Sequence, residues 1–153
     1  MAICKCGGYM TTKKYLSMYR KYMADIVFYE TMKEEAIQNV ASLRSPSFDD
    51  RVQSCPENDP IGNLVIAYER DVARYNIEIL SCKAKMFMID NQICQMREVN
   101  EEFFKLLAYR YKAGMDWQTI AEKMFLGLST VTHLHSPALA EFEKMFGEHY
   151  KYA

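Results

Sequence analysis

Glycine and proline are scarce in this sequence, which contains six and four of them among 153 residues. Half of the residues are hydrophobic and a quarter are charged. Because glycine and proline are the strongest breakers of regular structure, this composition predicts a compact, helix-rich, all-α protein of one or two small domains.

Long hydrophobic runs are also missing. The first ten residues lack the apolar core of a signal peptide, and no later run approaches the roughly 18 apolar residues that cross a bilayer. We therefore expect a cytoplasmic protein without a membrane segment, with a flexible leader over residues 1–10. The cysteines have no paired spacing of the kind that holds zinc, so no metal is expected; they are Cys4, Cys6, Cys55, Cys82 and Cys94.

Signatures of catalysis are absent as well. The sequence contains no phosphate-binding P-loop, no dinucleotide-binding glycine fingerprint, no nucleophile elbow and no pair of metal ligands on one helix. The adjacent carboxylates of Asp49 and Asp50 have no histidine near them and are expected to be solvated in a loop. We therefore predict a protein that is not an enzyme and needs no cofactor.

Neither sign of charge dominates, since 19 basic residues stand against 20 acidic ones and the net charge is −1. The sequence has no polybasic tail of the kind that binds nucleic acids or membranes without specificity. The stretch from Lys105 to His135 nevertheless has four basic residues against two acidic ones; the basic residues are Lys105, Arg110, Lys112 and Lys123. A modest basic face is therefore expected there.

Two long segments have apolar residues at alternating spacings of four and three, which is the heptad pattern of coiled coils. The first covers residues 12–43, and its seam is Tyr15, Tyr19, Tyr22, Ile26, Tyr29, Ala36, Val40 and Leu43, with Lys33 in register. The second follows Asp59 and Pro60, which suit the first positions of a helix. Its seam is Ile61, Val65, Tyr68, Val72, Tyr75, Ile79, Cys82, Met86, Ile89, Ile93 and Met96.

Residues 44–59, between the two segments, are polar and interrupted by proline, which predicts a linker. A linker of this length lets the second helix fold back, so residues 11–99 are predicted to form a long antiparallel helical hairpin, a coiled coil. A homodimer through the same seams is the alternative. The part of the second seam from Met86 to Met96 is expected to overhang and meet the C-terminal domain or another subunit. A solvated face is expected from Lys13, Lys14, Arg20 and Lys21.

Residues 100–153 are predicted to form a trihelical domain with a helix-turn-helix, in which short helices are separated by two turns. Asp116 is placed to cap the N-terminus of one helix. In the turn that follows this helix, Gly127 is expected to take a positive φ. Ser129 is then expected to cap the last helix, which would start at Thr130.

The last helix has apolar residues at spacings of three and four, which turn one face towards the preceding helices. Pro137 predicts a kink or a restart of this helix, with Ser136 as the new N-cap. His135 lies at the edge of the apolar face and is expected to be packed and hydrogen-bonded. His133 is expected to point outward.

The stretch AYRYKAGMDWQTIAEKMFLGLSTVTHLHSPAL, residues 108–139, resembles region 4 of sigma factors and the ArpU/RinA-type phage transcriptional regulators. The stretch SLRSPSFDDRVQSC, residues 42–55, is similar to the linker of a phage protein family of unassigned function. The resemblance thus extends from about Thr11 to Phe146. It implies a sequence-specific regulator of phage transcription that binds double-stranded DNA and contacts RNA polymerase. Family members usually carry basic residues at Ser136 and Pro137, so this departure implies weaker DNA binding.

In a helix-turn-helix, the second helix enters the major groove and outward residues near its N-terminus meet base edges. The candidate DNA-binding residues are Arg110, Lys112, Gln118, Thr119, Lys123, Ser129, Thr130, Thr132, His133 and Ser136. Two other functions are kept as alternatives. One is an adaptor or anti-activator that acts by protein–protein contact without binding DNA, and the other is a small terminase-like subunit of a DNA-packaging machine.

Overall fold

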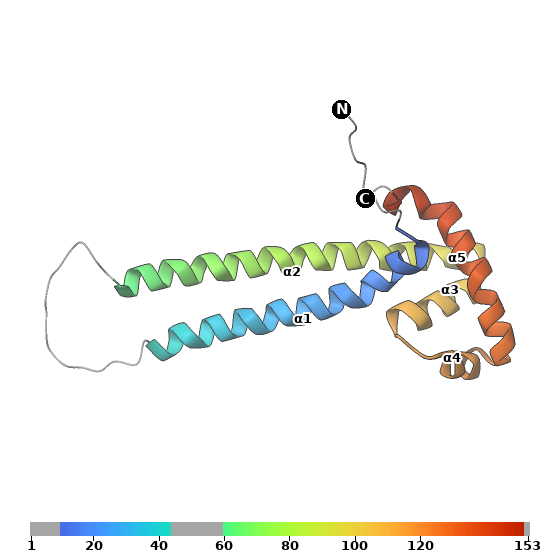
Figure 1. The fold of residues 1–153 in the computed structure, drawn as a ribbon, viewed down its shortest axis with the longest axis horizontal. Coiled ribbons are helices and arrows are strands. Elements are labelled where there is room, and N and C mark those ends of the chain that lie inside the picture. Colours follow the sequence, from blue (N-terminus) through green and yellow to red (C-terminus); the bar gives the residue numbers. More distant parts are fainter. Residues whose placement is uncertain (1–9, 44–59, 152–153) are drawn as a thin grey trace, which may run out of the picture. The chain divides into compact units, whose positions relative to one another are not determined.

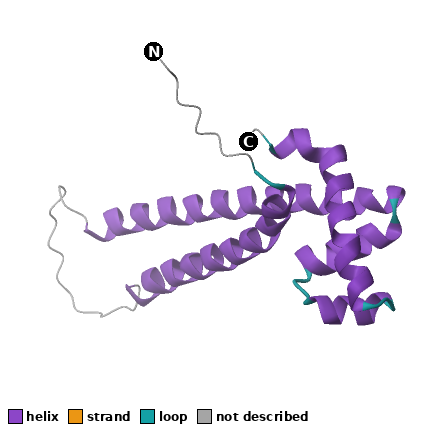
Figure 2. Cartoon of the chain, turned by 45° about the vertical axis from the view of Figure 1, so that its right-hand side comes forward, coloured by secondary structure: helices purple, strands orange, loops and turns teal. Residues whose placement is uncertain are grey.

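The computed structural model describes residues 10–43 and 60–151. Within these ranges the chain is all-α, as predicted, and contains no strand (Figures 1 and 2). The helices are α1 (Thr12–Leu43), α2 (Pro60–Val99), α3 (Glu101–Leu107), the π-helical segment η1 (Ala108–Lys112), α4 (Trp117–Met124) and α5 (Leu128–Tyr150). The predicted linker and most of the predicted leader lie outside the described residues.

The two long helices begin and end close to the bounds that the heptad patterns predict. Neither glycine nor proline occurs within α1, and α2 has proline only at its first position, Pro60, where a missing amide costs no hydrogen bond. In the part of the chain that the structure describes, no helix combines the length and the apolar character that crossing a bilayer requires.

The chain divides into two compact units. One contains the chain up to Met23 together with everything from Ala84 onward, and the other is the segment Ala24–Lys83. Both boundaries fall inside the long helices, so each unit contains a part of α1 and a part of α2.

In the unit formed by residues 24–83, α1 and α2 bury parts of their seams. Ile26 of α1 and Ile79 of α2 are buried there. The rings of Tyr29 and Tyr75 lie with their centroids 6.3 Å apart. Tyrosine suits this position because its ring supplies buried area while its hydroxyl reaches water at the edge of the seam.

The other unit has a single hydrophobic core to which both long helices contribute. Leu16 of α1 and both Ile93 and Met96 of α2 are fully buried in the same cluster as Leu106 of α3 and Phe142 of α5. The predicted contact between this end of α2 and the C-terminal domain is therefore confirmed. The first turns of α1 share in the contact, which the heptad pattern alone did not indicate.

Polar side chains tie the start of α1 to this core. The hydroxyls of Thr12 and Tyr150 lie 2.8 Å apart in a buried hydrogen bond. The ring of Tyr15 stacks on that of Tyr150 at a centroid distance of 4.3 Å, and the Tyr15 hydroxyl donates to the side-chain Oε1 of Gln92 over 2.9 Å. These buried polar groups thus have partners, as burial without large cost requires.

The segment α3–η1 begins at a well-formed cap and ends in a widened turn. The side chain of Asn100 accepts the amides of Glu102 and Phe103 over 2.8 and 3.4 Å. In η1 each backbone hydrogen bond spans one residue more than in an α-helix, so that the amide of Ala113 donates to the carbonyl of Ala108 over 3.1 Å. Gly114 then turns the chain with a φ of 68°, which glycine adopts without steric cost.

Candidate functional site

Helix α4 starts where the sequence predicted, with Asp116 at its N-cap. The carboxylate accepts a hydrogen bond from the hydroxyl of Thr119, while no first-turn amide reaches hydrogen-bonding geometry with it. This hydroxyl is the main cause that lowers the pKa of the Asp116 carboxyl, and nearby amides add to the effect. Asp116 and Thr119 therefore hold each other at the start of α4.

The turn after α4 differs from the prediction. Phe125, directly after the helix, is left-handed with a φ of 56°, whereas Gly127 has a φ of −68°. The amide of Phe125 donates to the carbonyl of Glu122 over 3.2 Å, and that of Leu126 to the carbonyl of Ala121 over 3.0 Å. These bonds satisfy the last carbonyls of α4 and require a left-handed residue two positions before Gly127. The predicted positive φ at Gly127 is therefore wrong.

Helix α5 begins two residues earlier than predicted. Gly127 occupies the N-cap, and its carbonyl accepts the amide of Val131 over 3.1 Å. The predicted start at Thr130 with Ser129 as cap is therefore wrong, because the short turn after α4 leaves Leu128 already in helical geometry.

Pro137 lies inside α5, which continues to Tyr150 without a restart. The predicted restart with Ser136 as N-cap is wrong. Val131 before the proline and both Ala138 and Phe142 after it are fully buried, while Pro137 itself is exposed. Packing on both sides thus holds the helix together despite the hydrogen bond that proline cannot make.

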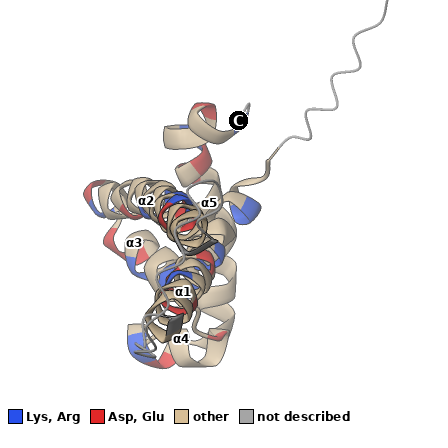
Figure 3. Cartoon of the chain, turned by 90° about the vertical axis from the view of Figure 1, so that its left-hand side faces the viewer, with Lys and Arg blue, Asp and Glu red and all other residues tan. Residues whose placement is uncertain are grey.

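The first half of α5 presents an exposed row of small polar side chains, which we call the α5 polar face: Ser129, Thr130, Thr132, His133 and Ser136. All five are candidate DNA-binding residues. The hydroxyl of Thr132 donates to the carbonyls of Leu128 and Ser129 of its own helix over 3.1 and 2.9 Å. Between Lys123 and Glu141 the chain has no Asp, Glu, Lys or Arg, so this face is uncharged (Figure 3).

The candidate DNA-binding residues of α4 lie on the side of the helix that faces solvent. Gln118 donates to the carboxylate of Glu122 over 3.3 Å. Lys123, in the last turn, is exposed and lies over the ring of Tyr109 with its ammonium 6.0 Å from the ring centroid. Lys123 therefore places a positive charge next to the turn that leads into α5.

Two further basic candidates lie in η1 and have partners. The guanidinium of Arg110 stacks over Trp117 at 4.5 Å from the ring centroid and donates to the carbonyl of Met115 over 2.9 Å. Lys112 forms an ion pair with Asp90 of α2. Burial works to lower the pKa of Lys112, but the Asp90 carboxylate outweighs it and the pKa is raised. Lys112 is thus a structural cation held against α2.

His135 is packed and hydrogen-bonded, so this prediction is confirmed. Its Nε2 lies 2.9 Å from the hydroxyl of Tyr111, and either atom can donate. Its ring meets Trp117 edge-on at a centroid distance of 4.9 Å. The pKa of His135 is lowered first by burial and then by the positive charges of Lys13 and Arg110. The imidazole is therefore neutral near pH 7.

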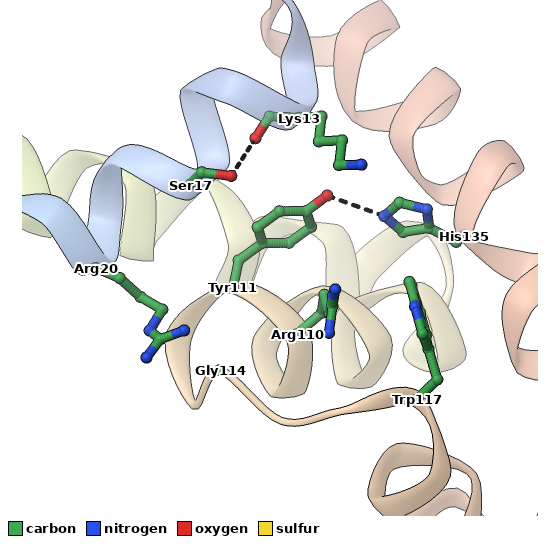
Figure 4. A pocket seen from close by; sticks show the side chains of 8 residues that line it. All are labelled: Lys13, Ser17, Arg20, Arg110, Tyr111, Gly114, Trp117 and His135. Carbon is green, nitrogen blue, oxygen red and sulfur yellow. Dashed lines mark hydrogen bonds between the residues drawn. The ribbon is translucent and has the colours of Figure 1, made fainter.

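Beside His135 a cavity of about 350 Å³ opens, and sequence reasoning missed it (Figure 4). We call it the basic cavity; it is lined by Lys13, Ser17, Arg20, Arg110, Tyr111, Gly114, Trp117 and His135. Lys13 and Arg20 were expected only to form a solvated face. Together with Ser17 they come from the start of α1, at least 90 positions before the remaining lining residues, so no local pattern could have placed them here.

No potential metal site accompanies these features in the described residues, where no three His, Cys, Asp or Glu side chains gather closely enough to hold an ion. Comparisons of the chain with known protein families, with curated proteins and with solved structures found no match.

Proposed function

We propose that this chain is a DNA-binding transcription regulator in which α4, the turn Phe125–Gly127 and α5 act as a helix-turn-helix. The observation that carries the proposal is the α5 polar face: five exposed hydroxyl and imidazole side chains on the first half of the second helix. Such side chains donate to and accept from base edges in the major groove. This is the part of the second helix that meets bases in a helix-turn-helix.

The charges around this face suit a protein that contacts DNA bases and makes few contacts to the phosphates. No carboxylate lies between Glu122 and Glu141 to repel the DNA backbone. Lys123 is exposed beside the turn and suits a phosphate contact. Lys112 is paired with Asp90 and contributes little to such contacts. Phosphate contacts supply most of the affinity for DNA, and few cations are available here to make them. We therefore expect weak binding, to which each of these few cations makes a large contribution.

The long helices are proposed to form an antiparallel coiled-coil hairpin that spaces or dimerises two such readers. Glu30 of α1 lies 3.6 Å from Lys83 of α2, and farther along α1, Val40 lines a cavity together with Val65 and Tyr68 of α2. Later residues of α1 thus meet earlier residues of α2, as in an antiparallel pair. RNA polymerase is proposed as a second partner by analogy of fold, because the sequence resembles region 4 of sigma factors.

The proposal is tested by selecting duplexes from a random-sequence library with the full chain and measuring the affinity of the selected duplex. His133→Ala removes one exposed side chain of the α5 polar face, and His149→Ala removes an exposed histidine near the end of the same helix. We expect His133→Ala to reduce the preference for the selected duplex by about 1 kcal/mol, roughly fivefold, and His149→Ala to leave it unchanged. Equal preference in wild type and a folded His133→Ala variant would reject the assigned reading role.

A second candidate function, an adaptor that acts through protein contact, is favoured by one observation. Phe125 is 94% exposed at the turn, and Leu128, three residues later at the start of α5, is 47% exposed. Neighbouring exposed apolar side chains are typical of protein interaction sites. If the adaptor function is right, the library selection yields no preferred duplex, and Phe125→Ser weakens association with the partner or with a second copy, as measured by sedimentation.

A further inference from the structure

The basic cavity collects three positive charges from two separate segments. Lys13 and Arg20 come from α1 and Arg110 from η1, while the lining contains no carboxylate. In Figure 4 the ammonium of Lys13 extends towards the hydroxyl of Tyr111 and the ring of His135. A recess lined by three cations without a counterion within it is suited to an anion, since cavities lined by one sign of charge concentrate ligands of the opposite sign.

One of these cations is held in place before any ligand arrives, and a second lies against the wall of the cavity. Arg110 is fixed by its stack on Trp117 and by its hydrogen bond to the Met115 carbonyl. The guanidinium of Arg20 packs directly against Gly114, where an added Cβ would come within 2.5 Å of its Cζ. A glycine at this position thus makes room for Arg20 at the wall of the cavity. Such positioning in advance lowers the entropic cost of binding.

The remaining lining groups suit a phosphoryl group. Tyr111 presents a hydroxyl and Arg20 a planar guanidinium, which donates two parallel hydrogen bonds to phosphate oxygens. His135 is adjacent, and its pKa is lowered first by burial and then by the positive charges of Lys13 from α1 and Arg110 from η1. The volume of about 350 Å³ lies within the range of small-ligand sites.

We propose that the basic cavity binds the phosphoryl group of a ligand, with Lys13 and Arg20 as the main contacts. The source is either a small free phosphorylated molecule or a backbone phosphate of DNA, and the two share the same chemistry. This inference goes beyond base reading by α5, because no residue of the α5 polar face lines the cavity.

Trp117 lines the cavity and is the single tryptophan of the chain, so its fluorescence reports on the site directly. We would titrate the full chain with inorganic pyrophosphate at constant ionic strength, and separately with duplex DNA. The test variant is Lys13→Ala with Arg20→Ala. The matched control is Lys14→Ala with Lys21→Ala, which removes the same charge from exposed neighbours on the same helix.

We expect a saturable change in Trp117 fluorescence with pyrophosphate, weakened about tenfold or more in the test variant and unchanged in the control. This result identifies a free phosphorylated molecule as the ligand. If only duplex DNA gives the change, with the same dependence on Lys13 and Arg20, the source is the DNA backbone. Absence of both responses from the folded protein, or equal loss in the control variant, overturns the proposal. Unchanged base preference in His133→Ala, which would reject the reading role of the α5 polar face, leaves the pyrophosphate result unaffected, so the two proposals fail separately.

Discussion

The backbone of the two turns around α4 gives a sharp test of the structure. Gly114 has a φ of 68°, where a residue with a Cβ loses about 1–2 kcal/mol. An alanine Cβ there would also meet Arg20, but a guanidinium at the end of a flexible side chain can move aside. Gly114→Ala is therefore expected to lower the free energy of unfolding by about 1–2 kcal/mol.

The other glycine of this region is the matched control. Gly127 has a φ of −68°, and an added Cβ would meet only the Thr130 hydroxyl at 3.7 Å, which is ordinary contact. Alanine is a poorer N-cap than glycine, but it restricts the unfolded chain more, so these effects nearly cancel. Gly127→Ala is expected to change stability by less than about 0.5 kcal/mol.

Phe125 supplies the opposite change. It is left-handed with a φ of 56°, and because its side chain is 94% exposed, removing that side chain sacrifices almost no buried area. Phe125→Gly is expected to raise the free energy of unfolding by about 1 kcal/mol.

Urea unfolding followed by Trp117 fluorescence measures all three variants, since this ring lies in the unit that contains both turns. The expected order of stability is Phe125→Gly, then wild type together with Gly127→Ala, then Gly114→Ala. If Gly127→Ala costs as much as Gly114→Ala, the left-handed position lies where the sequence suggested and the turn described above is wrong.

Three further results are expected. Because the pKa of His135 is lowered from its ordinary value of 6.5, the unfolded chain binds the proton at a higher pH than the folded chain does. The melting temperature should therefore fall as pH falls below about 6.5. His135→Gln should make this fall smaller, and an unaltered pH profile in the variant would contradict the prediction. Phe142→Ala should cost about 3–5 kcal/mol in urea unfolding, because the ring is fully buried, and a loss below about 1 kcal/mol would refute that packing. Lys112→Met should lower the melting temperature, because it leaves Asp90 unpaired, but should not change the affinity for DNA. Lys123→Met should reduce the salt dependence of DNA binding by the equivalent of about one phosphate contact. The reverse pattern would exchange the roles of the two lysines.

The long helices could be predicted from the sequence because their signal is local and repeated. Heptad spacing and the first-position proline determined the bounds of α1 and α2, and both seams include buried residues such as Ile26 and Ile79. Leu16 lies outside the predicted seam and is nevertheless fully buried. Its burial depends on α5 and the end of α2, which the pattern of α1 cannot reveal.

The candidate site was predictable only in part. The outward position of His133 and the packed position of His135 follow from helical periodicity, and the exposure of the first and the hydrogen bond of the second agree with it. The turn was not predictable, because the left-handed residue is a phenylalanine and glycine is the usual signal. The ion pair of Lys112 and the basic cavity depend on residues brought together from distant segments.

The central claim is that the α5 polar face reads DNA bases. It is tested most directly by the affinity of the full chain for a selected duplex and for a scrambled duplex of equal length, each at two salt concentrations. We predict tighter binding to the selected duplex at both, with both affinities falling as salt rises because phosphate contacts release counterions. Equal affinity for the two duplexes, or no binding at the lower salt concentration from a folded sample, would contradict the claim.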